Sequence, residues 1–197
     1  MVAWHKNLRS SRKESNVRKV VYSLTNSLDN FIARADGGAD WILMDDELMN
    51  EFPRFFEMFD TVLMGRKTYA VACAQSHHQD PSQAESGFMG MKTYVFSRTM
   101  KESPGGEVEL VSGDAGEFVR NLKKQSGRHI WLMGGGNLAA SLLKENLIDE
   151  INLAIQPVLL GSGVPLFPDG ERQVNLELVE SKTYRNGTVS VTYRVKS

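Results

Sequence analysis

The stretch Ile130-Trp131-Leu132-Met133-Gly134-Gly135-Gly136-Asn137-Leu138 decides the fold of this chain. An apolar run of strand type leads directly into three glycines, and apolar residues then recur at helical spacing from Leu138 onward. Glycines have no Cβ, so another group can approach the backbone closely, and the free N–H groups of the following helix attract an anion. The pattern predicts a phosphate-binding turn at the carboxyl end of a strand. The alternative interpretation is a tight packing turn without a ligand.

Strand-like runs and helical segments alternate along the rest of the chain. The strand-like runs are residues 20–24, 61–64, 92–96, 108–111, 150–158, 176–184 and 188–195. Helical patterns lie at 45–59, where Pro53 implies a kink or two short helices, and at 116–125. Asn186-Gly187 between the last two runs indicates a two-residue hairpin turn. Together these elements predict an α/β fold with a mostly parallel sheet and an antiparallel C-terminal hairpin.

Composition describes a globular protein with an uneven charge. The 197 residues are 41% hydrophobic and 24% charged, with a net charge of −1, so bulk charge gives no reason to expect nucleic acid or a membrane surface as partner. Residues 1–17 form a basic leader that we expect to be poorly ordered, followed by a single domain at 18–197. The lone Cys73 allows no internal disulfide, which favours the cytoplasm. We expect no transmembrane span and no metal, because adjacent His77 and His78 point opposite ways in extended chain.

Two further signals follow strand-like runs. Gly65-Arg66-Lys67-Thr68 combines a glycine that permits close approach with two positive charges and a hydroxyl. Ser97-Arg98 follows another run and offers a hydroxyl beside a guanidinium, which suits a phosphate. Each is weak alone, because basic residues at strand ends and solvated turns are common. In a parallel sheet, however, ligands bind at the carboxyl ends of strands, and an extended ligand with separated phosphates such as NADPH would explain all three signals.

The glycine turn also fits the Rossmann pattern as Gly134-x-Gly136-x-x-Ala139. That fingerprint requires an acid at the end of the next strand to hold the ribose hydroxyls. The next strand ends at Gln156-Pro157, and Asp149 and Glu150 stand at its start. A standard Rossmann interpretation therefore fails.

Four segments resemble the dihydrofolate reductase-like superfamily, and more closely the reductase domain of the bacterial bifunctional riboflavin-pathway deaminase-reductase. They are Ser27-Leu28-Asp29-Asn30-Phe31-Ile32-Ala33 with Asp36-Gly37 and Trp41; residues 62–69; residues 95–98; and the long stretch from Trp131 to Phe167. The resemblance implies a three-layer fold with NADPH across the carboxyl edge of the sheet. It assigns Gly65, Arg66 and Thr68, with Lys67 beside them, to the cofactor phosphates, Ser97 and Arg98 to the 2′-phosphate, and Gly134, Gly135, Gly136, Asn137 and Leu138 to the pyrophosphate.

Two acids are the catalytic candidates. The family places a carboxylate on the first helix a few residues after a tryptophan, and the spacing from Trp41 favours Asp46. Asp29 in the Ser-Leu-Asp loop is the other candidate. A buried carboxylate could orient a heterocycle or act as an acid. The alternative roles are a first-turn or N-cap acid for Asp46 and a turn-capping acid for Asp29.

The resemblance implies an NADPH-dependent reductase, a homodimer, acting on a small heterocycle such as 5-amino-6-(5-phosphoribosylamino)uracil in riboflavin biosynthesis. One cysteine cannot supply a zinc-deaminase site, so the deaminase half of the bifunctional enzyme is missing. Two alternatives stay open: a dihydrofolate reductase proper, and a non-catalytic NADPH-binding relative. Leu48 and Phe52, with Met44, are candidates for the substrate pocket or for a core face.

Overall fold

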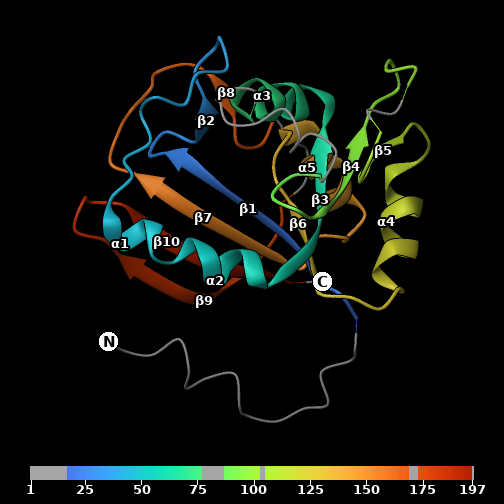
Figure 1. The fold of residues 1–197 in the computed structure, drawn as a ribbon. Helices are drawn as coiled ribbons and strands as arrows, with labels where there is room; N and C mark the ends of the chain where they lie inside the picture. Colours follow the sequence, from blue (N-terminus) through green and yellow to red (C-terminus); the bar gives the residue numbers. More distant parts are fainter. Residues whose placement is uncertain (1–16, 77–86, 103–104, 169–172, 197) are drawn as a thin grey trace.

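The computed structural model describes residues 17–76, 87–102, 105–168 and 173–196, which form an α/β fold (Figure 1). Its strands are β1 (Val20–Ser27), β2 (Phe31–Ala33), β3 (Phe59–Gly65), β4 (Lys92–Phe96), β5 (Val108–Val111), β6 (His129–Leu132), β7 (Glu150–Gln156), β8 (Val164–Pro165), β9 (Leu176–Thr183) and β10 (Val189–Val195). Its helices are α1 (Asp46–Met49), α2 (Phe52–Glu57), α3 (Arg66–Ser76), α4 (Ala115–Lys123) and α5 (Gly136–Lys144). Residues 1–16 of the predicted leader at 1–17, and the pair His77-His78, lie outside the described residues.

The central sheet has the order β5-β4-β3-β6-β1-β7-β10-β9. The six strands from β5 to β7 are parallel, and β10 pairs antiparallel with both β7 and β9. This confirms the predicted mostly parallel sheet with an antiparallel C-terminal hairpin. Because β4, β3 and β6 are neighbours, the three turns that follow them are brought side by side at one edge.

Helices cover both faces of the sheet, which gives the three predicted layers. One face packs α4 and α5 through Val119, Leu122, Ala139 and Leu142 against β1, β3 and β6. The opposite face packs α2 and α3 against Phe59, Val62, Met64 and Trp131. Successive side chains of a strand point to opposite faces, so Tyr22 belongs to the first core and Val21 to the second.

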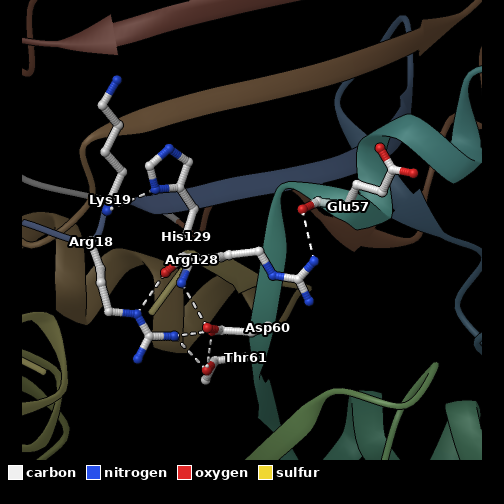
Figure 2. A network of polar contacts seen from close by, with 7 residues as sticks. All are labelled: Arg18, Lys19, Glu57, Asp60, Thr61, Arg128 and His129. Atoms are coloured by element: carbon white, nitrogen blue, oxygen red, sulfur yellow. Dashed lines mark hydrogen bonds and ion pairs between the residues drawn. The ribbon is translucent and has the colours of Figure 1, made fainter. Parts of the chain in front are cut away.

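A polar network fixes the amino ends of β1, β3 and β6 (Figure 2). Arg18, 5% exposed, pairs with Asp60 and donates to Arg128 O at 2.6 Å and to Thr61 Oγ1 at 2.6 Å. Asp60 also accepts from Arg128 N at 2.7 Å, and Lys19 N donates to His129 Nδ1 at 3.3 Å. The polar partners of the buried guanidinium lie at the start of β3 and immediately before β6. The network therefore sets where these strands begin, and hence where their carboxyl ends lie.

Two local expectations need correction. The hairpin turn between β9 and β10 has three residues, not two: Tyr184 N donates to Thr188 O at 2.9 Å, and Gly187 N donates to Tyr184 O at 3.0 Å. Gly187, at φ +88°, then returns the chain to the strand, the usual form of a three-residue loop with a left-handed residue. The segment at 45–59 forms two helices, with Pro53 in the first turn of α2, so the predicted division at that proline is confirmed.

Candidate functional site

A cavity of about 1440 Å³ runs along the carboxyl edge of the sheet. Every residue predicted to bind the cofactor lines it: Gly65, Arg66, Lys67, Thr68, Ser97, Arg98, Gly134, Gly135, Gly136, Asn137 and Leu138. They come from the ends of β4, β3 and β6, with β3 in the middle. The structure thus brings the three signals together, although their contact with a cofactor stays a prediction.

The turns after β3 and β6 lie against each other at van der Waals distance, and it is the backbone conformation of the second turn, not a lack of space, that favours glycine. A Cβ on Gly135 would lie 3.6 Å from Gly65 N, and one on Gly65 would lie 4.0 Å from Gly135 Cα. Gly134 and Gly135 have φ of +133° and +89°, a backbone that L side chains rarely adopt. Because these glycines have no side chains, the turn presents backbone atoms directly to the cavity. We call this backbone surface the cradle.

Two helix N-termini point into this cradle. α3 begins at Arg66 and α5 at Gly136, each directly after its strand or turn. No side chain caps α5 at Gly135, so the N–H groups of its first turn remain for a ligand, and the positive ends of both helix dipoles add to Arg66 and Lys67. This donor set fits a pyrophosphate.

The Ser97-Arg98 turn forms the far end of the cradle, after β4. Ser97 Oγ accepts from Thr99 N at 3.2 Å and from Met100 N at 3.0 Å and lies 3.3 Å from Thr99 Oγ1, so the hydroxyl shapes the turn. Arg98 is exposed beside it and lines the cavity. The geometry gives an exposed guanidinium at the point most distant from β1, suited to a peripheral phosphate.

The other half of the cavity lies over β6, β1, β7 and β10. Its floor carries the polar side chains Ser23, Thr25, Asn152 and Ser190. Strand register explains the grouping: Ser23 pairs with Asn152, while Thr25 and Ser190 both pair with Ala154. These strands therefore present hydroxyl and amide groups to one patch of the cavity.

Aromatic side chains from α2 and β6 form the wall above this floor. The ring of Trp131 lies 5.2 Å from Phe55 and 5.8 Å from Phe56, between centroids. Phe52 and Leu48 also line the cavity, as predicted for the substrate pocket, whereas Met44 does not and is 47% exposed. An apolar wall over a polar floor suits a flat, polar-edged ring.

The two catalytic candidates do not line the cavity. Asp46 is exposed in the first turn of α1, and its neighbour Asp45 is the N-cap, accepting from Leu48 N at 2.9 Å. This is the alternative first-turn role. Ile42 and Leu48, on either side of Asp46 in the sequence, line the cavity, whereas Asp46 is exposed, so a catalytic role for Asp46 stays a prediction that the geometry does not support.

Asp29 joins two loops. It accepts from Ser27 Oγ at 2.6 Å, Leu160 N at 3.1 Å and Gly161 N at 2.7 Å. The Ser27 hydrogen bond, followed by the backbone N–H groups, lowers the pKa of this carboxyl. The geometry matches the turn-capping alternative, with Asp29 holding the loop after β7 against the end of β1.

A cluster at Glu51 escaped the sequence analysis. Tyr184 OH donates to Glu51 Oε2 at 2.6 Å, Lys182 pairs with Glu51 Oε1, and both Glu51 and Tyr184 line the cavity. Glu51 precedes α2, whereas Lys182 and Tyr184 end β9 and begin the hairpin turn. No spacing pattern connects them, since only the packing of α2 over the hairpin brings them together.

The sheet order and the helices on both faces define a dihydrofolate reductase-like fold. The family model described as the RibD C-terminal domain matches residues 18–190, and the chain belongs to that family. The uncharacterized protein YyaP of Bacillus subtilis is 34% identical over 180 residues, which cover 89% of this chain and 94% of YyaP.

Solved structures share the fold. A Shewanella sp. PV-4 protein provisionally assigned to riboflavin biosynthesis superposes with a TM-score of 0.76 at 29% identity, over 91% of this chain and 99% of its own. Acinetobacter baumannii RibD superposes with a TM-score of 0.68 at 18% identity, over 93% of this chain and 59% of its own. The family points to a reductase-type domain, and these structures share its fold. Within its described residues, the chain has no helix long and apolar enough to cross a membrane.

Proposed function

We propose that this protein is an NADPH-dependent reductase of a small heterocyclic substrate, similar to 5-amino-6-(5-phosphoribosylamino)uracil reductase. One observation carries the proposal: three phosphate-type turns from β4, β3 and β6 share a continuous cavity with an aromatic-walled, polar-floored pocket over β1, β7 and β10. The arrangement suits a long anionic cofactor whose far end meets a flat substrate. The membership in the RibD C-terminal domain family supports the same activity.

The residues present fit the cofactor. The touching glycines Gly65 and Gly135 leave a cradle that a Cβ would fill, and the first turns of α3 and α5 supply backbone donors beside Arg66. Arg98 would hold the 2′-phosphate. When bound, NADPH supplies the hydride that reduces a C=N or C=O carbon. The chain's own residues bind and orient the two partners, and Trp131, Phe55 and Phe56 exclude water from the space between them.

Cofactor binding is the first test. Titration of the full-length protein with NADPH and NADH, followed by nicotinamide fluorescence, should show tighter binding of NADPH. Arg98→Gln should weaken NADPH about tenfold to a hundredfold and leave NADH unchanged, because only NADPH has a 2′-phosphate for a charge-assisted hydrogen bond. Arg185→Gln, at an exposed arginine outside the cavity, is the matched control. Absent NADPH binding, or equal binding of the two cofactors, would exclude the proposal.

Turnover distinguishes the remaining possibilities. NADPH oxidation should depend on the aminouracil ribosyl phosphate or a related pyrimidine. Turnover of dihydrofolate instead would favour a dihydrofolate reductase proper, and tight NADPH binding without turnover on the whole panel would favour a non-catalytic relative. We further propose a homodimer, since edge strand β9 exposes Leu176 and Leu178 at 40% and 54%, and a cytoplasmic location, which the single Cys73 favours. Leu178 pairs with Tyr193, so this apolar surface continues onto β10.

A further inference from the structure

The polar floor of the cavity continues past the residues that line it. Thr25, Ala154 and Ser190 form one row across β1, β7 and β10, and all three line the cavity. Two residues further along β1 and β7 stand Ser27 and Gln156, which are also partners in register. Side chains of a strand return to the same face at every second residue, so this next row faces the same way as the floor.

Thr188 completes this row, which we call the end row. Ser190 pairs with Ala154 in the antiparallel register, so Thr188, two residues earlier in the chain, lies opposite Gln156. Ser27, Gln156 and Thr188 are each 0% exposed. Polar side chains buried this deeply normally have hydrogen-bond partners, so the partners of the end row show what it is built to hold.

Two polar groups of the end row have partners within the protein. Ser27 Oγ donates to Asp29 Oδ1 at 2.6 Å and accepts from Phe31 N at 2.9 Å. Gln156 Oε1 accepts from Leu43 N at 3.0 Å. Because a backbone N–H can only donate, this bond also fixes which end of the Gln156 amide is the oxygen.

The other two polar groups of the end row have no partner. Among the described residues, the buried side-chain atoms without a hydrogen bond are Asn26 Oδ1, Gln156 Nε2 and Thr188 Oγ1. Asn26 precedes Ser27 in β1 and so faces the opposite side of the sheet. Gln156 and Thr188 stand opposite each other, next to the substrate half of the cavity. Buried donors left unpaired destabilise a fold, and a ligand that accepts from them would remove that cost.

The segment Ile42-Leu43 covers the end row. Ile42 lines the cavity, whereas Leu43 is 46% exposed. The segment lies between β2 and α1, outside any helix or strand. Besides the bond from Leu43 N to Gln156, Leu43 O accepts from Asn186 Nδ2 at 3.2 Å. Outward movement of these two residues would therefore break few hydrogen bonds and would join the end row to the cavity.

We propose that Gln156 and Thr188 form a subsite for the lactam edge of the substrate ring, the edge at which a ring N–H adjoins a C=O. This inference rests on the proposed reductase function and names the ring edge that its substrate presents. A primary amide matches that edge, because Gln156 Oε1 accepts from the ring N–H while Nε2 donates to the carbonyl. The Thr188 hydroxyl supplies a second donor to the same carbonyl. Leu43 N gives up Gln156 Oε1 as the ring enters.

The experiment uses the full chain and two probes, 5,6-diaminouracil and its 1,3-dimethyl derivative, which keeps both carbonyls but has no ring N–H. Calorimetric titration of the NADP⁺-saturated protein should show tighter binding of diaminouracil. Thr188→Val should weaken diaminouracil about threefold to tenfold, and Gln156→Leu about tenfold or more, because one and two hydrogen bonds are lost. Thr183→Val, at an exposed threonine of β9 outside the cavity, should bind as the wild type does.

Stability distinguishes this subsite from a purely structural hydroxyl. Thr188→Val removes a buried group that has no partner in the empty protein, so it should keep or raise Tm while it weakens the probe. A hydroxyl that serves the fold would instead lower Tm and leave the probe affinity unchanged. Hydrogen exchange of the peptide that contains Leu43 should become faster when diaminouracil binds, because the Leu43 N–H loses its acceptor.

Several results would overturn the assignment: no diaminouracil binding by the wild type, equal binding of the two probes, a Thr188→Val variant that binds as Thr183→Val does or melts below the wild type, or exchange at Leu43 that the probe leaves unchanged. Failure of the reductase function looks different, because the wild type would then bind no NADPH. The probe titration would in that case be read on the cofactor-free protein, where the dependence on Gln156 and Thr188 is still measured.

Discussion

Replacing Gly135 by alanine tests the proposed phosphate-binding turn at a residue whose left-handed backbone conformation favours glycine. Gly135 has φ +89° and ψ 85°, and an alanine there costs about 1–2 kcal/mol of strain. The new methyl group would lie 3.6 Å from Gly65 N, 3.7 Å from Gly65 Cα and 3.8 Å from Leu138 Cβ, which are ordinary van der Waals distances. The folding cost is therefore limited to strain, a fall in Tm of about 2–8 °C for a chain of this size.

The effect on the ligand should be larger than the effect on folding. The methyl group would occupy the gap between the two glycine turns, where the pyrophosphate is expected. Loss of one hydrogen bond to a charged group costs about 1.5–3 kcal/mol, so NADPH affinity should fall about tenfold to a hundredfold. Nicotinamide fluorescence measures the affinity, and thermal melting measures the stability of the same samples.

Gly161→Ala is the matched control. Gly161 has φ +73°, a Cβ there meets nothing within 4 Å, and the residue does not line the cavity. It should lose similar stability through the same backbone strain and keep its NADPH affinity. If Gly135→Ala binds NADPH as tightly as Gly161→Ala does, the cradle is a packing turn and the reasoning is refuted.

Three further predictions concern the framework. Arg18→Met should lower the free energy of unfolding by about 2–4 kcal/mol in urea titrations, because it leaves Asp60, Thr61 Oγ1 and Arg128 O without the buried guanidinium; a loss below about 1 kcal/mol would contradict the network's role. Asp29→Asn should be less stable than the wild type at pH 7. The Asp29 pKa is lowered in the folded state, so its contribution is present above about pH 4 and lost as the pH falls further, and a stability difference that persists at pH 2.5 would count against it. Leu178→Glu should convert a homodimer to monomer in size-exclusion chromatography with light scattering, and a wild-type monomer would disprove the proposed pairing.

Local patterns predicted most of the fold. β4 and β5 have the predicted bounds, and β1 and β3 extend beyond them, since hydrophobic runs mark where a strand lies better than where it ends. The β2–β8 pair was missed, because strands of three and two residues carry too little alternation to detect. The hairpin was located by Asn186-Gly187, but its loop length was wrong, since the same glycine serves both two-residue and three-residue loops.

Some residues of the candidate site could be predicted from the local sequence, whereas their arrangement across the sheet depends on tertiary packing. Glycines, arginines and hydroxyls directly after strands could be identified from the sequence, because each turn builds its own donor set from consecutive residues. Their order across the sheet, β4 then β3 then β6, is a property of topology and appears in no single segment.

By itself, then, the sequence determined a mostly parallel α/β fold and the positions of three turns proposed to bind anions, because strand periodicity and strand-to-helix turns are local. Only the tertiary structure decided which acid reaches the cavity. Asp46 stands at the plausible spacing after Trp41 but is exposed, whereas Glu51 enters the cavity through Lys182 and Tyr184, more than 130 residues away along the chain. A side chain's direction and partners depend on the elements packed against it, and those contacts arise only when α2 closes over the hairpin.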